Sequence, residues 1–232
     1  MNELLKQIKW QFLIFQRNNL LAMIIGVAAF YMLALYFLKD LGNPEKLATL
    51  IILADTSLIS FLFIGISIIL EKNQEVLSAL FITPINHHFF LISKAVTLSI
   101  VCLFCALAII SIVKGFSFNL LHFSIGTLSV TIIFSLVGVY IVSYTTEILH
   151  YILRSIPILA LMSLPLLNYF ELTHLSIFNL FPMQGGLYLI ANSFSESPNI
   201  TEIIYGYSLI IVWIPLIYWF VFRTFKARFV NT

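Results

Sequence analysis

Long apolar runs with almost no charge are the feature that most limits how this chain can fold. Of its 232 residues, 61% are hydrophobic and only 9% are charged. A soluble domain carries far more charge on its surface, so this composition predicts an integral membrane protein. Because a helix needs roughly 20 apolar residues to cross the hydrocarbon core, about six spans would use most of the chain. No soluble domain of any size is expected beside them.

The apolar runs predict six membrane-spanning helices, preceded by a shorter amphipathic helix. Residues 2–17 place apolar side chains at helical spacing, which favours an interfacial helix lying on the membrane. These side chains are Leu4, Ile8, Phe12 and Phe15. The expected spans are residues 20–38, 47–70, 88–113, 121–146, 155–171 and 203–222. We therefore predict an all-α membrane protein with one transmembrane domain over residues 1–232.

The distribution of lysine and arginine predicts the orientation of the chain, because these residues are enriched on the cytoplasmic side. With the N-terminus inside the cell, the inner segments hold most of them. The inner residues are Lys6, Lys9, Arg17, Lys72, Lys94, Arg154, Arg223, Lys226 and Arg228, and the outer residues are Lys39, Lys46 and Lys114. We expect a multi-pass protein of the cell's inner (plasma) membrane with both termini in the cytoplasm.

Residues 172–201 are apolar enough to suggest a seventh span, but Pro182, Gly185 and Gly186 interrupt them. A seventh span would also place the basic C-terminus outside, against the charge distribution. We expect instead a broken external segment, either re-entrant or lying on the surface. It should pack against protein, because its backbone polar groups need hydrogen bonds. Such a segment could cap or gate the outer mouth of a transport path.

The stretch EKNQEVLSALFITP, residues 71–84, places charged side chains between the second and third expected spans. A helix here would have one apolar face and would leave Glu71, Lys72 and Glu75 for water or a partner. The apolar face would contain Val76, Leu77, Leu80 and Phe81. Pro84 stops the helix and disfavours helical backbone at Thr83. We predict a short helix over residues 71–82 that transmits movement of a soluble partner to the two spans it connects.

This stretch resembles the segment between the second and third spans of type-2 ABC exporter permeases. Their pattern is close to E-R-x-x-G-T-L-x-x-L-x-x-T-P, with a lysine further along. The matching positions are Glu71, Lys72 in place of Arg, Leu77, Leu80, Thr83, Pro84 and Lys94. Glu75 and Val76 stand where Gly and Thr are usual. The order of amphipathic helix, six spans and broken external segment is also similar, most of all to small exporters of drugs or antibiotic peptides.

The resemblance implies that residues 71–82 form a coupling helix that docks on a separate ATPase subunit. The docking residues would be Glu71, Lys72, Glu75, Leu77, Leu80, Thr83 and Pro84. It also implies two ATPase subunits and a second permease, either another copy or a sister chain. The cargo would be amphipathic or lipophilic, such as a drug, an antimicrobial peptide or a lipid. No G-x-x-x-x-G-K-[ST] phosphate loop occurs in the chain, so ATP and Mg²⁺ are expected on the ATPase.

Asp55 is the acidic residue expected well inside a span. A charge at that depth costs about 2.5 kcal/mol or more unless it is paired, protonated or hydrated. A mildly polar stripe follows it on the same helix, made of Thr56, Ser60, Phe63 and Ser67. Two interpretations are open. The stripe could line a substrate path on which Asp55 meets a cationic cargo, or Asp55 could reach water or a neighbouring hydroxyl near the outer interface while the small polar residues pack helices.

No catalytic site, metal site, bound cofactor or nucleic-acid partner is expected. The histidines are scattered, and Cys102 and Cys105 lie inside an apolar run, where they are expected to pack. Two other functions stay open. A secondary transporter or channel without an ATPase would need ionisable residues in several spans, and only Asp55 qualifies. A non-transporting immunity or assembly subunit would use the same docking helix.

Overall fold

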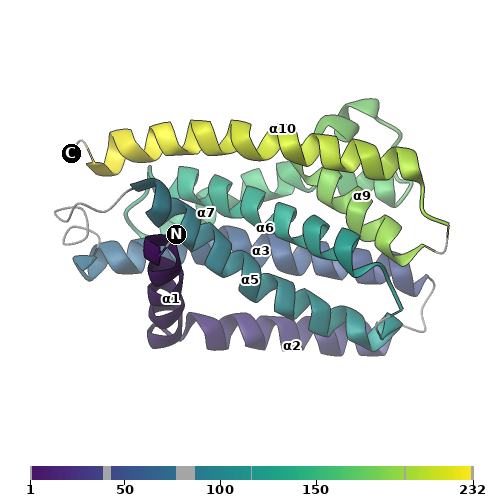
Figure 1. The fold of residues 1–232 in the computed structure, drawn as a ribbon, viewed down its shortest axis with the longest axis horizontal. Helices are drawn as coiled ribbons and strands as arrows, with labels where there is room; N and C mark the ends of the chain where they lie inside the picture. The colour runs from purple at the N-terminus through teal and green to yellow at the C-terminus, as the bar shows by residue number, and fades with distance from the viewer. Residues whose placement is uncertain (1, 39–42, 77–86, 116, 196, 231–232) are drawn as a thin grey trace.

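A computed structural model describes residues 2–38, 43–76, 87–115, 117–195 and 197–230. The long helices run side by side along one axis, as Figure 1 shows. In chain order the described α-helices are α1 (Asn2–Arg17), α2 (Leu20–Leu38), α3 (Pro44–Asn73), α5 (His87–Lys114), α6 (Leu120–Val142), α7 (Ile148–Met162), α8 (Pro165–Tyr169), α9 (Pro182–Phe194) and α10 (Ile200–Phe225). A 3-10 helix, η1 (Ser176–Leu180), precedes α9, and a π-helical turn, η2 (Lys226–Val230), follows α10. No strand occurs in these ranges.

Six helical stretches within the described ranges are long and apolar enough to cross a membrane. They cover residues 20–38, 44–73, 87–114, 120–142, 148–169 and 200–228. The prediction of an all-α integral membrane protein is confirmed. The fourth expected span was too long, because α6 ends at Val142 and the polar residues around Thr145 form a turn. The fifth therefore begins earlier than expected, at Ile148, and continues through α8.

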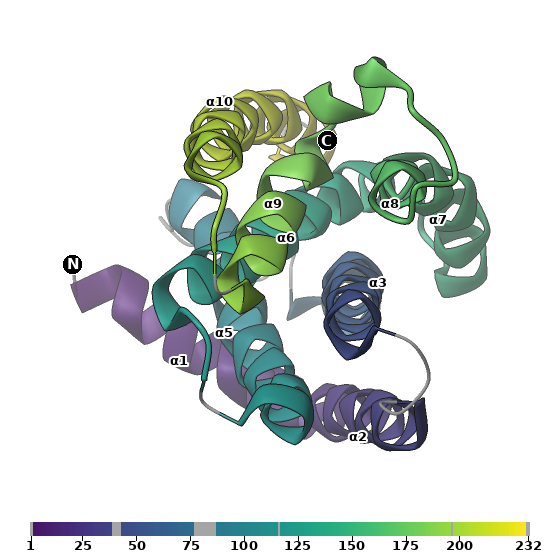
Figure 2. The ribbon, with the colours of Figure 1, turned by 90° about the vertical axis from the view of Figure 1, so that its right-hand side faces the viewer.

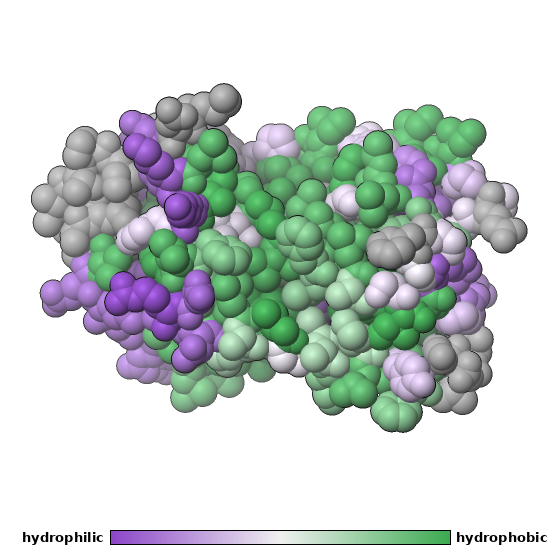
Figure 3. All heavy atoms as spheres, turned by 60° about the horizontal axis from the view of Figure 1, so that its bottom comes forward, coloured by the Kyte–Doolittle hydropathy of each residue, from purple (hydrophilic) through white to green (hydrophobic). Residues whose placement is uncertain are grey.

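The centre of the bundle is formed by α3 and α6. In each, 72% of the most apolar window is buried inside the protein, compared with 22% in α2 and 17% in the last span. Seen along the axis, α3 stands between α2 and α7, with α6 beside it (Figure 2). Figure 3 shows apolar side chains gathered over the middle of one face and hydrophilic side chains towards its ends. This pattern is that of a bundle whose outer helices face lipid or another membrane subunit.

One aromatic side chain joins α7 to this central pair. Tyr151 is fully buried, and its hydroxyl group donates a hydrogen bond to the carbonyl oxygen of Phe61 on α3. Its ring fills the space left by Gly65 on α3 and Gly138 on α6. A Cβ atom on Gly65 would lie only 2.1 Å from Cζ of Tyr151. The absence of a side chain at these glycines therefore makes room for the contact that holds α7.

The first helix, α1, lies across one end of the bundle (Figure 1), which we call the α1 end. It has the bounds expected from the sequence, and Asn19, with a φ of 56°, turns the chain into α2. Gln11 and Phe15 are buried against the bundle, whereas Lys6 and Lys9 are exposed. This two-sided helix packs mainly on α5. Its position on a membrane surface stays a prediction.

The opposite end, which we call the α9 end, contains the interrupted segment. The expected break is present at Pro182, where η1 ends and α9 begins. Most of α9 is buried against α6 and α10, whereas most residues from Leu172 to Leu180 are exposed. Hydrogen bonds from Trp213 Nε1 to the Leu180 oxygen and from Tyr205 Oη to the Asn179 oxygen attach η1 to α10. These two bonds satisfy backbone oxygens of η1, although Leu175, Ile177 and Leu180 keep exposed side chains.

Candidate functional site

A buried ion pair at the α1 end connects three helices. Lys94 on α5 has no exposed surface, and its Nζ lies 2.5 Å from Oε1 of Glu71 on α3. The same ammonium group donates to Ser67 Oγ at 3.0 Å and to Gln11 Oε1 on α1 at 3.1 Å. The rings of Phe15 and Phe90 lie 5.9 and 5.3 Å from Nζ and add cation–π contacts. A buried charge with this many partners is compensated on every side, which is what its burial requires.

The ion pair is not completely satisfied on the glutamate side. Oε2 of Glu71 and Nε2 of Gln11 have no hydrogen-bond partner among the described residues. Beside Glu71 lies a cavity of about 280 Å³ whose lining includes Trp10, Arg17 and Gln74. The carboxylate therefore has one oxygen committed to Lys94 and one oxygen available for a further donor. Glu71 therefore borders both the buried pair and this cavity.

The position of Glu71 corrects one expectation. The sequence pattern left Glu71 for water or a partner, but it is 1% exposed and lies inside α3. The pair with Lys94 favours one more turn of α3, which runs to Asn73, so residues 71–73 do not begin a separate helix. Lys72 and Glu75 are exposed, as expected, and Glu75 has a φ of 57° at the end of this helix. Leu77, Leu80, Thr83 and Pro84 lie outside the described residues.

Asp55 lies in the middle of α3 and is completely buried. Neither carboxylate oxygen has a hydrogen-bond partner among the described residues. The groups close enough to act on it electrostatically include Tyr31 on α2 and the thiols of Cys102 and Cys105 on α5. A carboxylate without a partner at this depth is held at a large cost in its charged form. In this conformation Asp55 reaches neither water nor a neighbouring hydroxyl, the two contacts of the second interpretation.

The polar stripe beside Asp55 is also buried. Thr56 and Ser60 donate hydrogen bonds to carbonyl oxygens of α3 itself, at Ile52 and Thr56, over 2.7 and 2.5 Å. Phe63 is 8% exposed, and Ser67 belongs to the Lys94 cluster. These contacts are those of residues that pack helices together, and the stripe lines no open path in this conformation.

The glycines predicted for an outer gate lie where three helices cross closely. A Cβ atom on Gly185 would be 2.9 Å from the Gly206 oxygen on α10. On Gly186 it would be 2.2 Å from Cγ2 of Val130 and 3.0 Å from the Gly126 oxygen, both on α6. Glycine is needed at both positions because two backbones approach α9 from opposite sides. Pro182 provides the first residue of α9, where its missing N–H is not needed.

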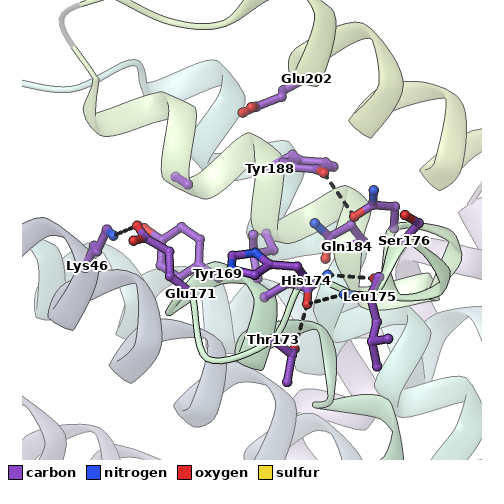
Figure 4. Close-up of a pocket in the computed structure, with 14 residues that line it drawn as sticks. Lys46, Tyr169, Glu171, Thr173, His174, Leu175, Ser176, Gln184, Tyr188 and Glu202 are labelled. Atoms are coloured by element: carbon purple, nitrogen blue, oxygen red, sulfur yellow. Dashed lines mark hydrogen bonds and ion pairs between the residues drawn. The ribbon is translucent and has the colours of Figure 1, made fainter.

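The α9 end also contains a polar cavity of about 510 Å³, shown in Figure 4. Lys46 from α3 meets Glu171 there, with Nζ and Oε1 2.8 Å apart. This hydrogen bond holds the pKa of the Glu171 carboxyl below its usual range. Gln184 and Tyr188 on α9 and Glu202 on α10 line the same cavity. The sequence analysis did not find this site, because its residues come from segments far apart in the chain and form no motif.

No group of three or more His, Cys, Asp or Glu side chains in the part of the chain that the structure describes could hold a metal ion. Cys102 and Cys105 are buried in α5 and form no disulfide. The described residues thus form a buried ion pair at the α1 end and a polar cavity at the α9 end.

Comparisons with known proteins place nearly the whole chain in one family. A family model described as the fluoroquinolones export permease protein family matches residues 2–232. Two curated relatives, from two strains of Mycobacterium tuberculosis, are described as fluoroquinolones export permease proteins. Each is 26% identical to the chain over 147 residues, which is 63% of the chain and 62% of the relative. The match thus spans somewhat less than two thirds of the length of these relatives.

Proposed function

Because the chain belongs to the fluoroquinolones export permease protein family, an ABC-type permease family, we propose that it is the membrane subunit of an ATP-driven exporter. The match over residues 2–232 is the observation that carries this proposal. Two permease subunits, either two copies or this chain and a sister, would enclose a path across the membrane. Two ATPase subunits would bind ATP and Mg²⁺ at the α1 end, which would face the cytoplasm.

The segment that begins at Lys72 would dock on the ATPase. Its first residues, Lys72 and Asn73, are the last residues of α3, directly after Glu71, and Lys72 and Glu75 are exposed. Movement of the segment would reach α3 first. Through Glu71 and Lys94 it would reach α5, and through Gln11 it would reach α1. ATP can drive such movement only if the ATP-bound and ATP-free states of the ATPase differ in their free energy of interaction with the segment.

The cargo would be an amphipathic or lipophilic compound. The two relatives are described as exporters of fluoroquinolones, and drug-like molecules of that kind fit the family. Antimicrobial peptides and lipids remain further candidates within the same chemical class. Asp55 would meet cationic cargo when a different conformation opens the interface beside α3. In the conformation described here the residue is closed off.

A second candidate function rests on Asp55 alone. A buried carboxylate without a partner is the kind of group that proton-driven transporters use, so a secondary transporter is the main alternative. The two functions differ in their energy source. Proteoliposomes that contain the permease alone would move cargo along a pH gradient in the second case. In the first case transport would need the ATPase and ATP.

The docking proposal is tested by co-purification with the ATPase encoded beside this chain. We expect the double variant Lys72→Glu/Leu77→Asp to lose both association and ATP-dependent transport, because it reverses a charge and removes an apolar contact. Ser197→Asp, which adds a charge to an exposed position at the α9 end, is the control. Full association of the double variant, with transport intact, would show that the segment is not the docking site.

A further inference from the structure

We propose that the cavity at the α9 end binds organic compounds that carry a protonated amine. Only the position of this cavity on the outer side of the membrane rests on the proposed function. Binding itself needs neither ATP nor the ATPase. The cavity, about 510 Å³, has the size of sites that hold drug-like molecules. Its walls come from the start of α3, the end of α8, the loop that follows, η1, α9 and the start of α10 (Figure 4).

The first observation is an amide oxygen without a partner. Gln184 is 4% exposed and lines the cavity, yet its Oε1 has no hydrogen-bond partner among the described residues. A buried acceptor is normally paired, because leaving it unpaired costs the free energy of removing it from water. In Figure 4 Gln184 lies among the lining side chains, between Tyr188 and His174. The cavity thus presents an acceptor that an N–H group of a ligand can satisfy.

The second observation is the charge of the lining. Lys46 is the lysine that lines the cavity, and Glu171 already neutralises it at 2.8 Å. Glu202 faces the cavity as a second carboxylate. Two amide groups donate hydrogen bonds to this carboxylate: Asn192 Nδ2 lies 2.9 Å from Oε2, and Asn199 Nδ2 lies 3.1 Å from Oε1. These donors fix the carboxylate without neutralising its charge, so the lining as a whole is negative at neutral pH.

The class of ligand follows from these two features. An anion would meet Glu202 and the oxygen of Gln184, which both repel it, and would have to displace Glu171 from Lys46. An ammonium group is attracted to Glu202 and can donate a hydrogen bond to Gln184. The ring of Tyr188 adds a surface on which a cation or an aromatic group can rest. The site therefore selects compounds with a protonated amine over neutral compounds of the same shape.

Binding is measured with the full chain in phosphatidylcholine nanodiscs and two fluorescent probes. The probes are dansylcadaverine, which carries a primary amine, and its N-acetylated derivative, which is neutral; empty nanodiscs correct for probe dissolved in lipid. We expect the amine to bind more tightly than the neutral probe. Glu202→Gln should raise the dissociation constant of the amine by roughly tenfold or more, the size expected for the loss of one charged hydrogen bond. It should leave the neutral probe unchanged.

Matched variants make the assignment specific. Gln184→Leu removes the unpaired amide and should also weaken the amine, even where Glu202→Gln is poorly folded. Glu45→Gln removes a charge at the same end from a glutamate that is paired with Lys114 and does not line the cavity. This variant should bind the amine probe with a dissociation constant within about twofold of that of the unmodified chain. Equal binding of both probes, or full amine selectivity in either folded lining variant, overturns the proposal.

A labelling experiment separates this proposal from the proposed orientation. Ser176 is exposed and lines the cavity, and both native cysteines are buried, so Ser176→Cys provides one accessible thiol. We expect dansylcadaverine to slow its reaction with a maleimide, and the neutral probe to have no effect. Reaction with a membrane-impermeant maleimide on intact cells supports the outward orientation. Protection that is seen only after the cells are opened contradicts that orientation and leaves the binding site intact.

Discussion

At the scale of residues, Lys94 explains the most about this molecule. A fully buried lysine is tolerated only where acceptors surround its ammonium group, and here Glu71, Ser67 and Gln11 provide them. The sequence pattern contained both Glu71 and Lys94 but could not show that they meet. Their contact depends on the rotation of α3 against α5, which hydrophobic periodicity does not define when both helices are apolar all round. The prediction therefore found the residues and missed their burial.

The first prediction concerns this pair. Lys94→Met leaves Glu71 buried without its counter-ion, so we expect the free energy of unfolding to fall by about 3–5 kcal/mol. Lys94→Met/Glu71→Leu removes both charges and should recover much of that loss. Thermal unfolding of the purified single and double variants in detergent measures the effect. Losses that simply add in the double variant would show that the two side chains act independently.

The second prediction concerns Asp55, whose carboxylate has no partner in this conformation. Asp55→Asn keeps the shape and removes the charge, so we expect stability to be unchanged or raised and assembly with the ATPase to be intact. Transport of cationic cargo should change relative to neutral cargo, because the variant offers no counter-charge. Thermal unfolding and uptake into inverted vesicles measure the two effects. Unaltered transport of several cations would exclude Asp55 from the path.

At the scale of elements, the sequence located the helices well and their ends less well. α2 has the predicted bounds, because polar residues stand at both ends of its apolar run. α3 begins earlier than predicted, because Asn43 caps it by accepting hydrogen bonds from the N–H groups of Glu45 and Lys46. That start signal, Asn followed by Pro, was present in the sequence. The close packing of α9 could not be predicted, because it depends on glycines from three separate helices.

The third prediction concerns the attachment of α7. Gly65→Ala would bring a Cβ atom within 2.1 Å of the buried Tyr151 ring, so the ring must move. We expect the free energy of unfolding to fall by about 1–3 kcal/mol, as in other overpacked interiors. Gly26→Ala is the control, because a Cβ atom there meets nothing within 4 Å. Equal thermal stability of the two variants would show that Tyr151 does not hold α7 to α3.

At the scale of the whole molecule, the low charge content was enough to predict the fold class. The same property leaves the outer helices, such as α2 and α10, with largely exposed apolar surfaces. The polar sites were harder to predict because each is built from distant segments. The cavity at the α9 end, for example, joins Lys46 to Glu202, which are separated by most of the chain. Composition thus determines where the chain resides, and the few polar contacts determine what its two ends can do.

The glycine contacts at the α9 end have a practical consequence. Around Gly185 and Gly186, backbone oxygens of α6 and α10 and side chains such as Val130 lie so close to α9 that an added Cβ atom would meet them within about 3 Å. An engineer who wishes to alter the α9 end must leave these positions untouched. The useful changes are then confined to the cavity rim, the loop before η1 and the first turn of α10.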